Sequence, residues 1–326
     1  MKLTRVFTAV LAASAVCATA TLSAFAADSF PSRPIRVLVP NGAGSSVDTL
    51  TRIVTTRMSD VIKQQLVIDN RAGAGGVIGM EIGKGANPDG YTMISATTAA
   101  STIARLLVKN PTYHPVNDYD MVGQFGITLN VLVVANSLPV KSVPELIAYA
   151  KSGKQPFNMA SAGVGSQSHL SGAYFMLEAK FDSLHVPYKG GGASVAALVA
   201  GESQWSLTPS AAAMTHVNAK RMRAIGHSLK KATALMPGIP PISDTIPGFD
   251  YTGWMGFMVP KGTPKSITEK LRVAMVETMK APDVVRGMAF QGTEIAILGP
   301  VEFRKEVLDS MAKNAKLVKT VGLQAN

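Results

Sequence analysis

Cysteine is almost absent from this chain of 326 residues. The single cysteine, Cys17, lies in an N-terminal segment that we expect to be removed on export. The mature protein would then have no thiol, which excludes disulfide bonds and cysteine catalysis. A lipid-anchored form is not expected, because the bulky Val16 precedes Cys17 where a lipoprotein signal would carry a small residue.

Long apolar runs are also scarce. The first segment carries Lys2 and Arg5, continues with an apolar run over residues 6–16, and closes on the small-x-small pattern of residues 24–26. This order is typical of a secretory signal peptide. The run is too short for a membrane anchor, which needs about 20 apolar residues. We therefore predict a signal peptide over residues 1–26, cleaved near Ala26, and a periplasmic mature protein.

The motifs of common enzyme sites are missing as well. No G-x-S-x-G nucleophile elbow occurs, and the five histidines form no H-x-x-x-H pair of the kind that zinc sites use. Ser166 and His169 lie three residues apart at a predicted helix start. That spacing suits helix capping and ligand contact better than a nucleophile with its base, although it leaves a hydrolase open. We predict that the protein is not an enzyme and holds no metal.

Glycine-rich loops are present, but they do not match phosphate-binding motifs. In residues 73–79, Ile78 occupies the third glycine position of G-x-G-x-x-G, and Ser168 occupies it in residues 161–168. No G-x-x-x-x-G-K-[ST] motif occurs. We expect neither a nucleotide nor any other cofactor.

Acidic residues are outnumbered, and the formal net charge is +11. An excess of positive charge steers anions toward a protein surface. Lys and Arg are spread along the chain, and an exported protein would rarely meet a chromosome, so we expect no nucleic-acid partner. The charge mildly favours an anionic ligand.

Strand-like and helix-like segments alternate from the mature N-terminus onward. Residues 35–39 form an apolar, β-branched run that is typical of a strand buried on both faces. A Gly/Ser loop follows, and then Leu50, Val54 and Met58 recur at helical spacing. Such alternation predicts parallel sheets covered by helices.

A second set of elements begins near residues 131–134. Ser142 and Glu145 predict a capped helix start. Beyond a Pro/Gly-rich linker at 236–248, residues 253–259 predict another strand, and two helices follow, the first capped by Ser266 and ending before Pro282. We predict an α/β fold of two lobes, each a mostly parallel sheet flanked by helices, with a terminal segment that returns to the first lobe.

Three glycine-rich loops, 41–46, 73–79 and 161–168, follow predicted strands and precede predicted helices. In open α/β sheets the crevice at the carboxyl ends of the strands holds ligands. Helix N-termini there present free N–H groups and a partial positive charge, which suit a carboxylate or phosphate. One such loop alone could be a simple turn, but three together favour anion binding.

Both tryptophans, Trp205 and Trp254, lie in strand-like segments. We expect them in the core, although contact with a ligand stays open for either one.

The sequence as a whole also resembles a known family. It is similar to the periplasmic receptors of tripartite tricarboxylate transporters, also called the Bordetella uptake gene receptors. The matching motifs run through the whole mature chain in the family's order and spacing; they lie at residues 31–36 with 39–40, 69–76, 87–92, 160–163 with 165–166 and 169–170, 185–191, and 253–254 with 260–264.

The resemblance implies a periplasmic binding protein fold of the type II kind, with two hinge crossovers and a cleft that closes over a ligand. We expect residues 27–126 plus 250–326 to form lobe 1 and residues 127–249 to form lobe 2. The implied function is capture of a small di-, tri- or aromatic carboxylate and its delivery to the membrane permease subunits, by a monomer. A ligand-sensing module for a sensor kinase and, less so, a hydrolase acting on organic acids remain alternatives.

Site residues follow from the resemblance and from the helix starts. The expected ligand contacts are Asn41, Gly42, Ala43, Gly44, Ser45, Ser46, Asp48, Gly75, Gly76 and Thr97 in the first lobe, and Ser161, Gly163, Gly165, Ser166, His169, Lys189 and Thr208 in the second. Two features depart from the family pattern. Asn41 stands where an aromatic residue is common, and Thr208 stands where an acid could pair with an amino group, which disfavours an amino-acid ligand. Bulky residues in place of Gly76 or Ser166 are expected to abolish binding in a folded protein.

Overall fold

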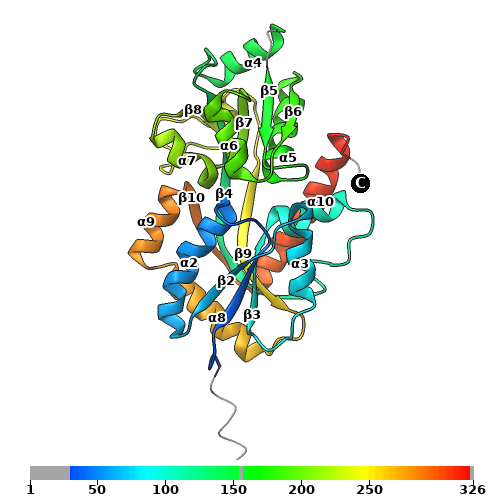
Figure 1. Ribbon diagram of the computed structural model, residues 1–326, viewed down its shortest axis with the longest axis vertical. Helices are drawn as coiled ribbons and strands as arrows, with labels where there is room; N and C mark the ends of the chain where they lie inside the picture. The colour runs from blue at the N-terminus through cyan, green and yellow to red at the C-terminus, as the bar shows by residue number, and fades with distance from the viewer. Residues whose placement is uncertain (1–29, 154–156, 324–326) are drawn as a thin grey trace, which may run out of the picture.

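Two α/β lobes, one above the other in Figure 1, share one long strand, β4 (Tyr119–Ala135), which pairs with strands of both sheets. The computed structural model describes residues 30–153 and 157–323, so the predicted signal peptide lies outside the described part. No helix in those two ranges is long and apolar enough to cross a membrane. The predicted two-lobed α/β fold is confirmed.

The lower lobe in Figure 1 contains a sheet in the order β2-β1-β3-β9-β4, with β10 also paired to β4. Its strands are β1 (Ile35–Val39), β2 (Leu66–Asn70), β3 (Thr92–Thr97), β4 (Tyr119–Ala135), β9 (Thr252–Pro260) and β10 (Thr293–Leu298). The sheet of the upper lobe is formed by the far end of β4 together with β5 (Asn158–Ser161), β6 (Leu184–Pro187), β7 (Trp205–Pro209) and β8 (Met222–His227).

Both sheets are mixed, which corrects the prediction of mostly parallel sheets. The outer pairs, β1 with β2 and β3 and β5 with β6 and β7, are parallel. The pairs that involve β4 or β9 are antiparallel. The reason is the connectivity, because a strand that returns from the second lobe must run against the strand that leaves the first.

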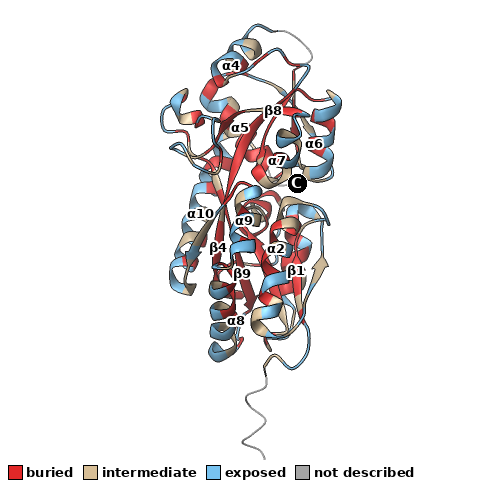
Figure 2. Ribbon diagram, turned by 90° about the vertical axis from the view of Figure 1, so that its left-hand side faces the viewer, coloured by how far each residue is buried: buried red, intermediate tan, exposed pale blue. Residues whose placement is uncertain are grey.

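Helices cover both faces of each sheet, and Figure 2 shows buried strands between helices whose outer faces are exposed. The lower lobe carries α2 (Ser46–Ile62), α3 (Val77–Lys84), α8 (Lys265–Thr278), α9 (Pro282–Phe290) and α10 (Pro300–Thr320). The upper lobe carries α4 (Val143–Lys151), α5 (Gln167–Ala179), α6 (Gly191–Ala200) and α7 (Ser210–Asn218). The short turns are η1 (Ala74–Gly76), the π-helix η2 (Ala99–Ile103), η3 (Ala104–Leu107) and η4 (Ile242–Asp244).

Strand β1 shows why its sequence has no polar alternation. Val37 packs with residues of α2, α8 and α9 in one hydrophobic cluster, whereas its neighbour Leu38 packs with α3 and α10 in another. Both side chains are completely buried. Successive side chains point to opposite faces of a strand, so a strand covered on both faces must be apolar throughout.

The C-terminal region differs from the prediction. Between the two predicted helices the structure has α9 and β10, and the Pro282 that was taken as a helix end is the first residue of α9. Proline is favoured at the first helical position because its missing N–H would be unpaired there. Helix α8 begins at Lys265 with Pro264 at the N-cap position, so the predicted Ser266 cap is wrong.

Strand β4 passes from one sheet to the other between Leu129 and Asn130. Leu129 pairs with Thr252 on β9, and Asn130 pairs with Pro209 on β7. The backbone N–H of the buried Asn130 donates to Ser228 Oγ at 2.9 Å, and its Nδ2 donates to the Tyr251 carbonyl at 3.1 Å. Asn130 of β4 is thus hydrogen-bonded to the residue that follows β8 and to the residue that precedes β9, where the chain crosses between the lobes. The residue boundaries of the two lobes stay a prediction.

Candidate functional site

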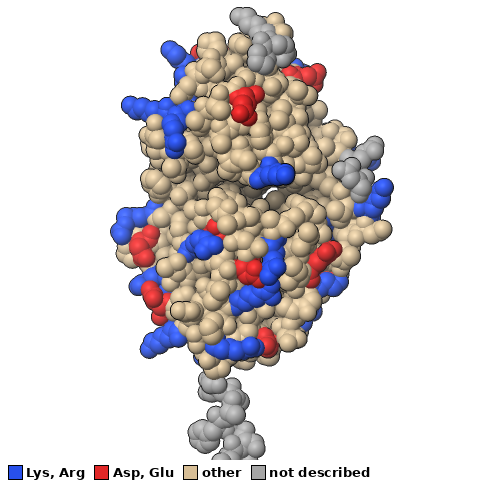
Figure 3. All heavy atoms as spheres, viewed as in Figure 1, with Lys and Arg blue, Asp and Glu red and all other residues tan. Residues whose placement is uncertain are grey.

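A cavity of about 620 Å³ lies where the two lobes meet, and Figure 3 shows the molecule hollowed between them. Its walls come from residues 40–47, 72–76, 97 and 99 on one side and 162–164, 166–168, 189–193, 208–209 and 212 on the other. Thr128, Trp254 and Met255 of the two crossover strands complete the lining. The cavity therefore lies at the carboxyl ends of the strands, where ligands bind in open α/β sheets.

Four helix N-termini converge on this cavity. They belong to α2, α3, α5 and α6, and each is preceded by residues of the lining: Ser45, Gly76, Ser166 and Gly190 occupy the four N-cap positions. The first N–H groups of a helix have no partner inside the helix, and the aligned peptide dipoles place partial positive charge there. A negatively charged group in the cavity would be stabilised from both lobes.

Several of these amides are free to donate. In the part of the chain that the structure describes, the N–H groups of Ser46, Val47, Gln167 and Ser168 make no hydrogen bond to a backbone or side-chain acceptor, whereas those of Asp48 and His169 are taken by the capping serines. The caps set the start of each helix, and the amides just inside them remain available to a ligand.

The lining has almost no ionisable side chains. Among its described residues, Lys189 is the single one, and no carboxylate is present. Lys189 is exposed and comes just before the glycines that open α6. Among the described lining residues, the ammonium group of Lys189 is therefore the only formal charge, and the helix N-termini add partial positive charge beside it.

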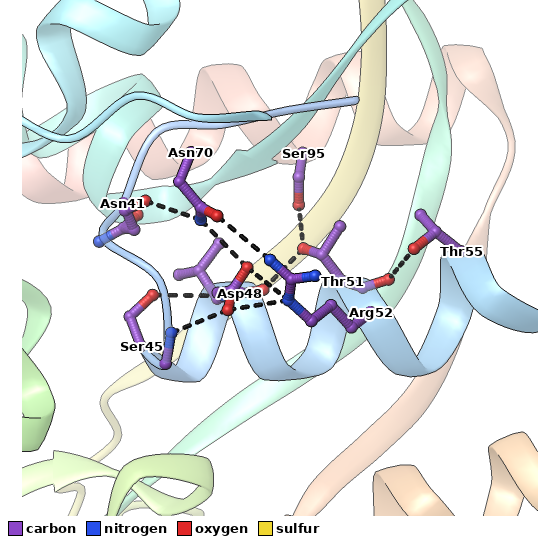
Figure 4. A network of polar contacts seen from close by, with 10 residues as sticks. Asn41, Ser45, Asp48, Thr51, Arg52, Thr55, Asn70 and Ser95 are labelled. Atoms are coloured by element: carbon purple, nitrogen blue, oxygen red, sulfur yellow. Dashed lines mark hydrogen bonds and ion pairs between the residues drawn. The ribbon is translucent and has the colours of Figure 1, made fainter. Parts of the chain in front are cut away.

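The predicted contact Asp48 does not line the cavity; it holds the first loop from behind, as Figure 4 shows. Its carboxylate accepts hydrogen bonds from the Gly44 N–H at 2.8 Å, from Asn70 Nδ2 at 3.0 Å and from Arg52 Nε at 3.0 Å. Asn70 also donates to the Asn41 carbonyl at 3.0 Å, which ties the loop to strand β2.

Asp48 stays ionised, and Arg52 forms an ion pair with it. Burial by itself would raise the pKa of this carboxyl, but the hydrogen bonds from Arg52, Gly44 and Asn70 outweigh it and hold the pKa below its usual value. Arg52 balances the negative charge at the same point. An anion in the cavity therefore meets the loop amides without an uncompensated carboxylate behind them.

Two stacked imidazoles support the third loop in a similar way. The rings of His169 and His185 lie 3.9 Å apart and 6° from parallel. His169 Nδ1 accepts the Gly165 N–H at 3.1 Å, and His185 Nε2 lies 2.6 Å from the Ser161 hydroxyl. Ser161, Gly165 and His169 are buried and do not line the cavity, so they position the loop that does.

The two histidines are neutral at ordinary pH. Burial lowers the pKa of His169 to about 4, and the neighbouring His185 adds to the shift. Burial also lowers the pKa of His185. Because Nδ1 of His169 accepts the Gly165 N–H, its remaining proton is on Nε2.

These contacts weaken the hydrolase alternative. Ser161 and His185 form the closest serine–histidine pair in the described site, but Ser161 is completely buried and no carboxylate is hydrogen-bonded to His185. The pair noted in the sequence behaves as a cap: Ser166 Oγ accepts the backbone N–H of His169 at 3.2 Å. Neither serine has the exposed, base-activated arrangement that acyl transfer needs.

Gly76 has a structural reason to be glycine. Its φ is +108°, and a Cβ at this position would lie 2.6 Å from the Ala100 Cβ and 3.1 Å from the Pro40 carbonyl oxygen. Valine there would strain the backbone and push the second loop away from β1. The expectation that a bulky residue at Gly76 would spare the fold is therefore wrong.

The remaining predicted contacts lie in the cavity wall: Asn41, Gly42, Ala43, Gly44, Ser45, Ser46, Gly75, Gly76, Thr97, Gly163, Ser166, Lys189 and Thr208. Their contact with a ligand stays a prediction. Sequence reasoning missed the start of α6 at residues 190–193, although its glycine run was visible, and it missed Gln167 and Thr128. Thr128 had no local signal, because only the packing of β4 against β9 brings it to the wall.

The stacked histidines predict a pH dependence of stability. The pKa of His169 is near 4 in the folded protein and near 6.5 when unfolded, so only the unfolded chain gains this proton as the pH falls through that window. We expect the free energy of unfolding to decrease between pH 6.5 and pH 4, with up to about 3 kcal/mol due to His169. Urea unfolding at several pH values measures this change in the free energy of unfolding.

The matched variant is His169→Asn, whose side-chain oxygen can still accept the Gly165 N–H but does not titrate. At pH 8, where the histidine is neutral in both states, the variant should be close to wild type. Below pH 6 its stability should fall less steeply. Equal slopes for the two proteins would contradict the assignment.

Known proteins resemble this chain in sequence and in fold. The family model described as the tripartite tricarboxylate transporter family receptor matches residues 50–323. A relative from Pseudomonas sp. (strain P51), the UPF0065 protein in the tcbD-tcbE intergenic region, is 34% identical over 306 residues, which cover 92% of this chain and 89% of the relative.

Solved structures show the same fold. R. palustris Rpa4515 with adipate has a TM-score of 0.87 at 27% identity, covering 91% of this chain and 100% of that one. MatC (Rpa3494) from Rhodopseudomonas palustris with bound malate has a TM-score of 0.81 at 27% identity, covering 89% of this chain and 100% of that one. The resemblance seen in the sequence is thus confirmed, and the chain belongs to the tripartite tricarboxylate transporter receptor family.

Proposed function

We propose that this protein is a periplasmic solute-binding receptor that captures a small organic carboxylate between its lobes and delivers it to the permease of a tripartite tricarboxylate-type transporter. The observation that carries the proposal is the cavity wall, in which four helix N-termini and Lys189 face a space without any carboxylate among the described lining residues. Adipate and malate in the two R. palustris structures support the ligand class.

The binding step follows from the placement of the donors. A carboxylate first docks on one lobe, where the backbone N–H groups inside the caps of two helices donate hydrogen bonds to its oxygens. The other lobe then adds its own two helix ends, and this second set of hydrogen bonds stabilises the closed state. Asn130 and the two crossover strands form the point about which the lobes would turn.

The composition of the cavity wall also disfavours one class of ligand. An ammonium group on the ligand would need a carboxylate, and none lies among the described lining residues, so amino acids are disfavoured. Release of the ligand unchanged is also supported, because the serines of the site act as caps and loop supports.

A thermal-shift panel tests the proposal. Aliphatic dicarboxylates, tricarboxylates and aromatic carboxylates are added to the purified mature protein, with the methyl ester of each acid as the uncharged control. A true ligand at 100 times its dissociation constant should stabilise the folded state by about 2.7 kcal/mol, whereas its ester should not. No stabilisation by any acid, or conversion of a bound acid to product, would contradict the proposal.

Tryptophan fluorescence gives an independent measurement. Trp254 lines the cavity, whereas Trp205 is fully buried in the upper lobe. In a Trp205→Phe variant, the emission of the remaining tryptophan should therefore change on addition of the acids that raise the melting temperature.

A further inference from the structure

Among the four helices whose N-termini line the cavity, α2 alone carries an acidic residue in its first turn. That residue, Asp48, is 3% exposed, and its carboxylate accepts the N–H of the lining residue Gly44 at 2.8 Å. A negative charge at a helix N-terminus is attracted by the partial positive charge there. A carboxylate at this point competes with any other anion, so an uncompensated Asp48 would oppose the binding of an anionic ligand.

The first glycine-rich loop nevertheless needs this carboxylate. A Cβ on Gly42 or Gly44 would have no heavy atom within 4 Å, so packing does little to hold the loop at these positions. Hydrogen bonds hold it instead: Asp48 accepts the Gly44 N–H, and Asn70 Nδ2 donates to the Asn41 carbonyl at 3.0 Å. Asn70 Nδ2 also donates to the carboxylate at 3.0 Å. The loop therefore depends on a charge that must itself be balanced.

Arg52 balances this charge from one turn further along α2, as Figure 4 shows. Its Nε lies 3.0 Å from each carboxylate oxygen of Asp48. Among the described residues it is the only cation within ion-pair distance of Asp48, because Arg36 and Arg71 of the neighbouring segments pair with Asp69 instead. The Arg52 side chain is half exposed and does not line the cavity.

We infer that Arg52, from outside the cavity wall, sets the affinity for an anionic ligand by cancelling the charge of Asp48. With the pair intact, the loop keeps its hydrogen bonds and the start of α2 keeps its partial positive charge for the ligand. Removal of Arg52 alone would leave a nearly buried carboxylate uncompensated next to the bound anion. The inference rests on the proposed function, that an organic carboxylate binds in this cavity. Arg52 is a positioning residue, since it acts through Asp48.

Isothermal titration at pH 8 with adipate and malate tests the inference. Arg52→Gln should weaken the binding of whichever acid wild type binds at least tenfold, because the Asp48 carboxylate then repels the ligand. Arg52→Lys keeps the positive charge and should retain most of the affinity. The double variant Asp48→Asn with Arg52→Gln should bind several-fold more tightly than Arg52→Gln alone, because the asparagine oxygen can still accept the Gly44 N–H while no charge remains.

Arg57→Gln is the matched control. Arg57 lies on the same helix outside the cavity wall and forms an ion pair with Asp60 at 3.2 Å, so its variant removes the same formal charge and should bind like wild type. Melting temperatures of all variants verify that they fold.

Three results would overturn the inference and leave the receptor function in place. They are wild-type affinity in Arg52→Gln, an equal loss in Arg52→Lys, and a double variant that binds no better than Arg52→Gln. The last result would show a purely structural role, since removing a second group cannot repair a lost contact. If neither acid binds, the acid of the thermal-shift panel that stabilises wild type most is titrated in their place. Binding of no acid at all would overturn the proposed function together with this inference.

Discussion

Replacing Gly42 with leucine is expected to lower the affinity for the carboxylate at least a hundredfold, about 2.7 kcal/mol, while the protein stays folded. Gly42 lies in the cavity wall at the approach to α2. A Cβ at this position would have no heavy atom within 4 Å, so the chain can accept a side chain without displacing a neighbour. The leucine would occupy the space next to the free amides of Ser46 and Val47 and keep the ligand from them.

The corresponding change in the other lobe is Gly192→Leu. Gly192 lies in the wall at the start of α6 and likewise has no atom within 4 Å of a Cβ. Loss of binding in both variants would show that both lobes contact the ligand. Gly85→Ala, at the end of α3 and outside the wall, is the control, since its nearest neighbour would be 3.7 Å away. If Gly42→Leu and Gly192→Leu bind as tightly as wild type, the ligand occupies another site.

Replacing Trp205 with alanine is expected to destabilise the protein by about 3–5 kcal/mol. Trp205 is completely buried in the upper lobe, and the rings of Phe157, Phe175 and Phe181 surround it at centroid distances of 6.1, 5.7 and 5.7 Å. Its indole Nε1 donates to Ser183 Oγ at 3.0 Å. Alanine would leave a cavity among these aromatic rings, and urea unfolding measures the loss of stability.

Trp205→Phe is the matched variant, because it keeps an aromatic ring and removes the hydrogen bond to Ser183. It should lose clearly less stability than the alanine variant. A loss below about 1 kcal/mol for Trp205→Ala would mean that the cluster relaxes around the gap. Trp205 begins β7, the strand that ends with Thr208 and Pro209 at the cavity, so binding should weaken together with the packing.

The helix N-caps and the buried faces of helices could be predicted from the sequence alone. Ser142 caps α4 and accepts the Glu145 N–H at 3.3 Å, as its spacing predicts. Leu50, Val54 and Met58 form the buried face of α2, as their period predicts. Such features depend on residues three or four apart, so the sequence contains all that is needed to find them.

The roles of the polar side chains near the glycine-rich loops could not be predicted from the sequence in this way. Asp48 and His169 stand at helix starts beside the glycine loops, and from the sequence they predict ligand contacts. In the structure they face inward, where Arg52 and Asn70 hold one and Gly165 and His185 engage the other. Arg52 is a local partner, but Asn70 and His185 come from distant segments, and no spacing rule connects them with their partners.

The amino-acid sequence by itself determined the family, the alternation of strands and helices, and the glycine-rich helix starts that suit an anion, because each depends on motifs or on neighbours along the chain. Only the tertiary structure decided which of those residues face the cavity and which support it from behind. It also decided the antiparallel pairing of β4 with β9 and the placement of Asn70 beside Asp48. The physical reason is that burial and hydrogen bonding between segments distant in the sequence exist only after the two lobes have packed.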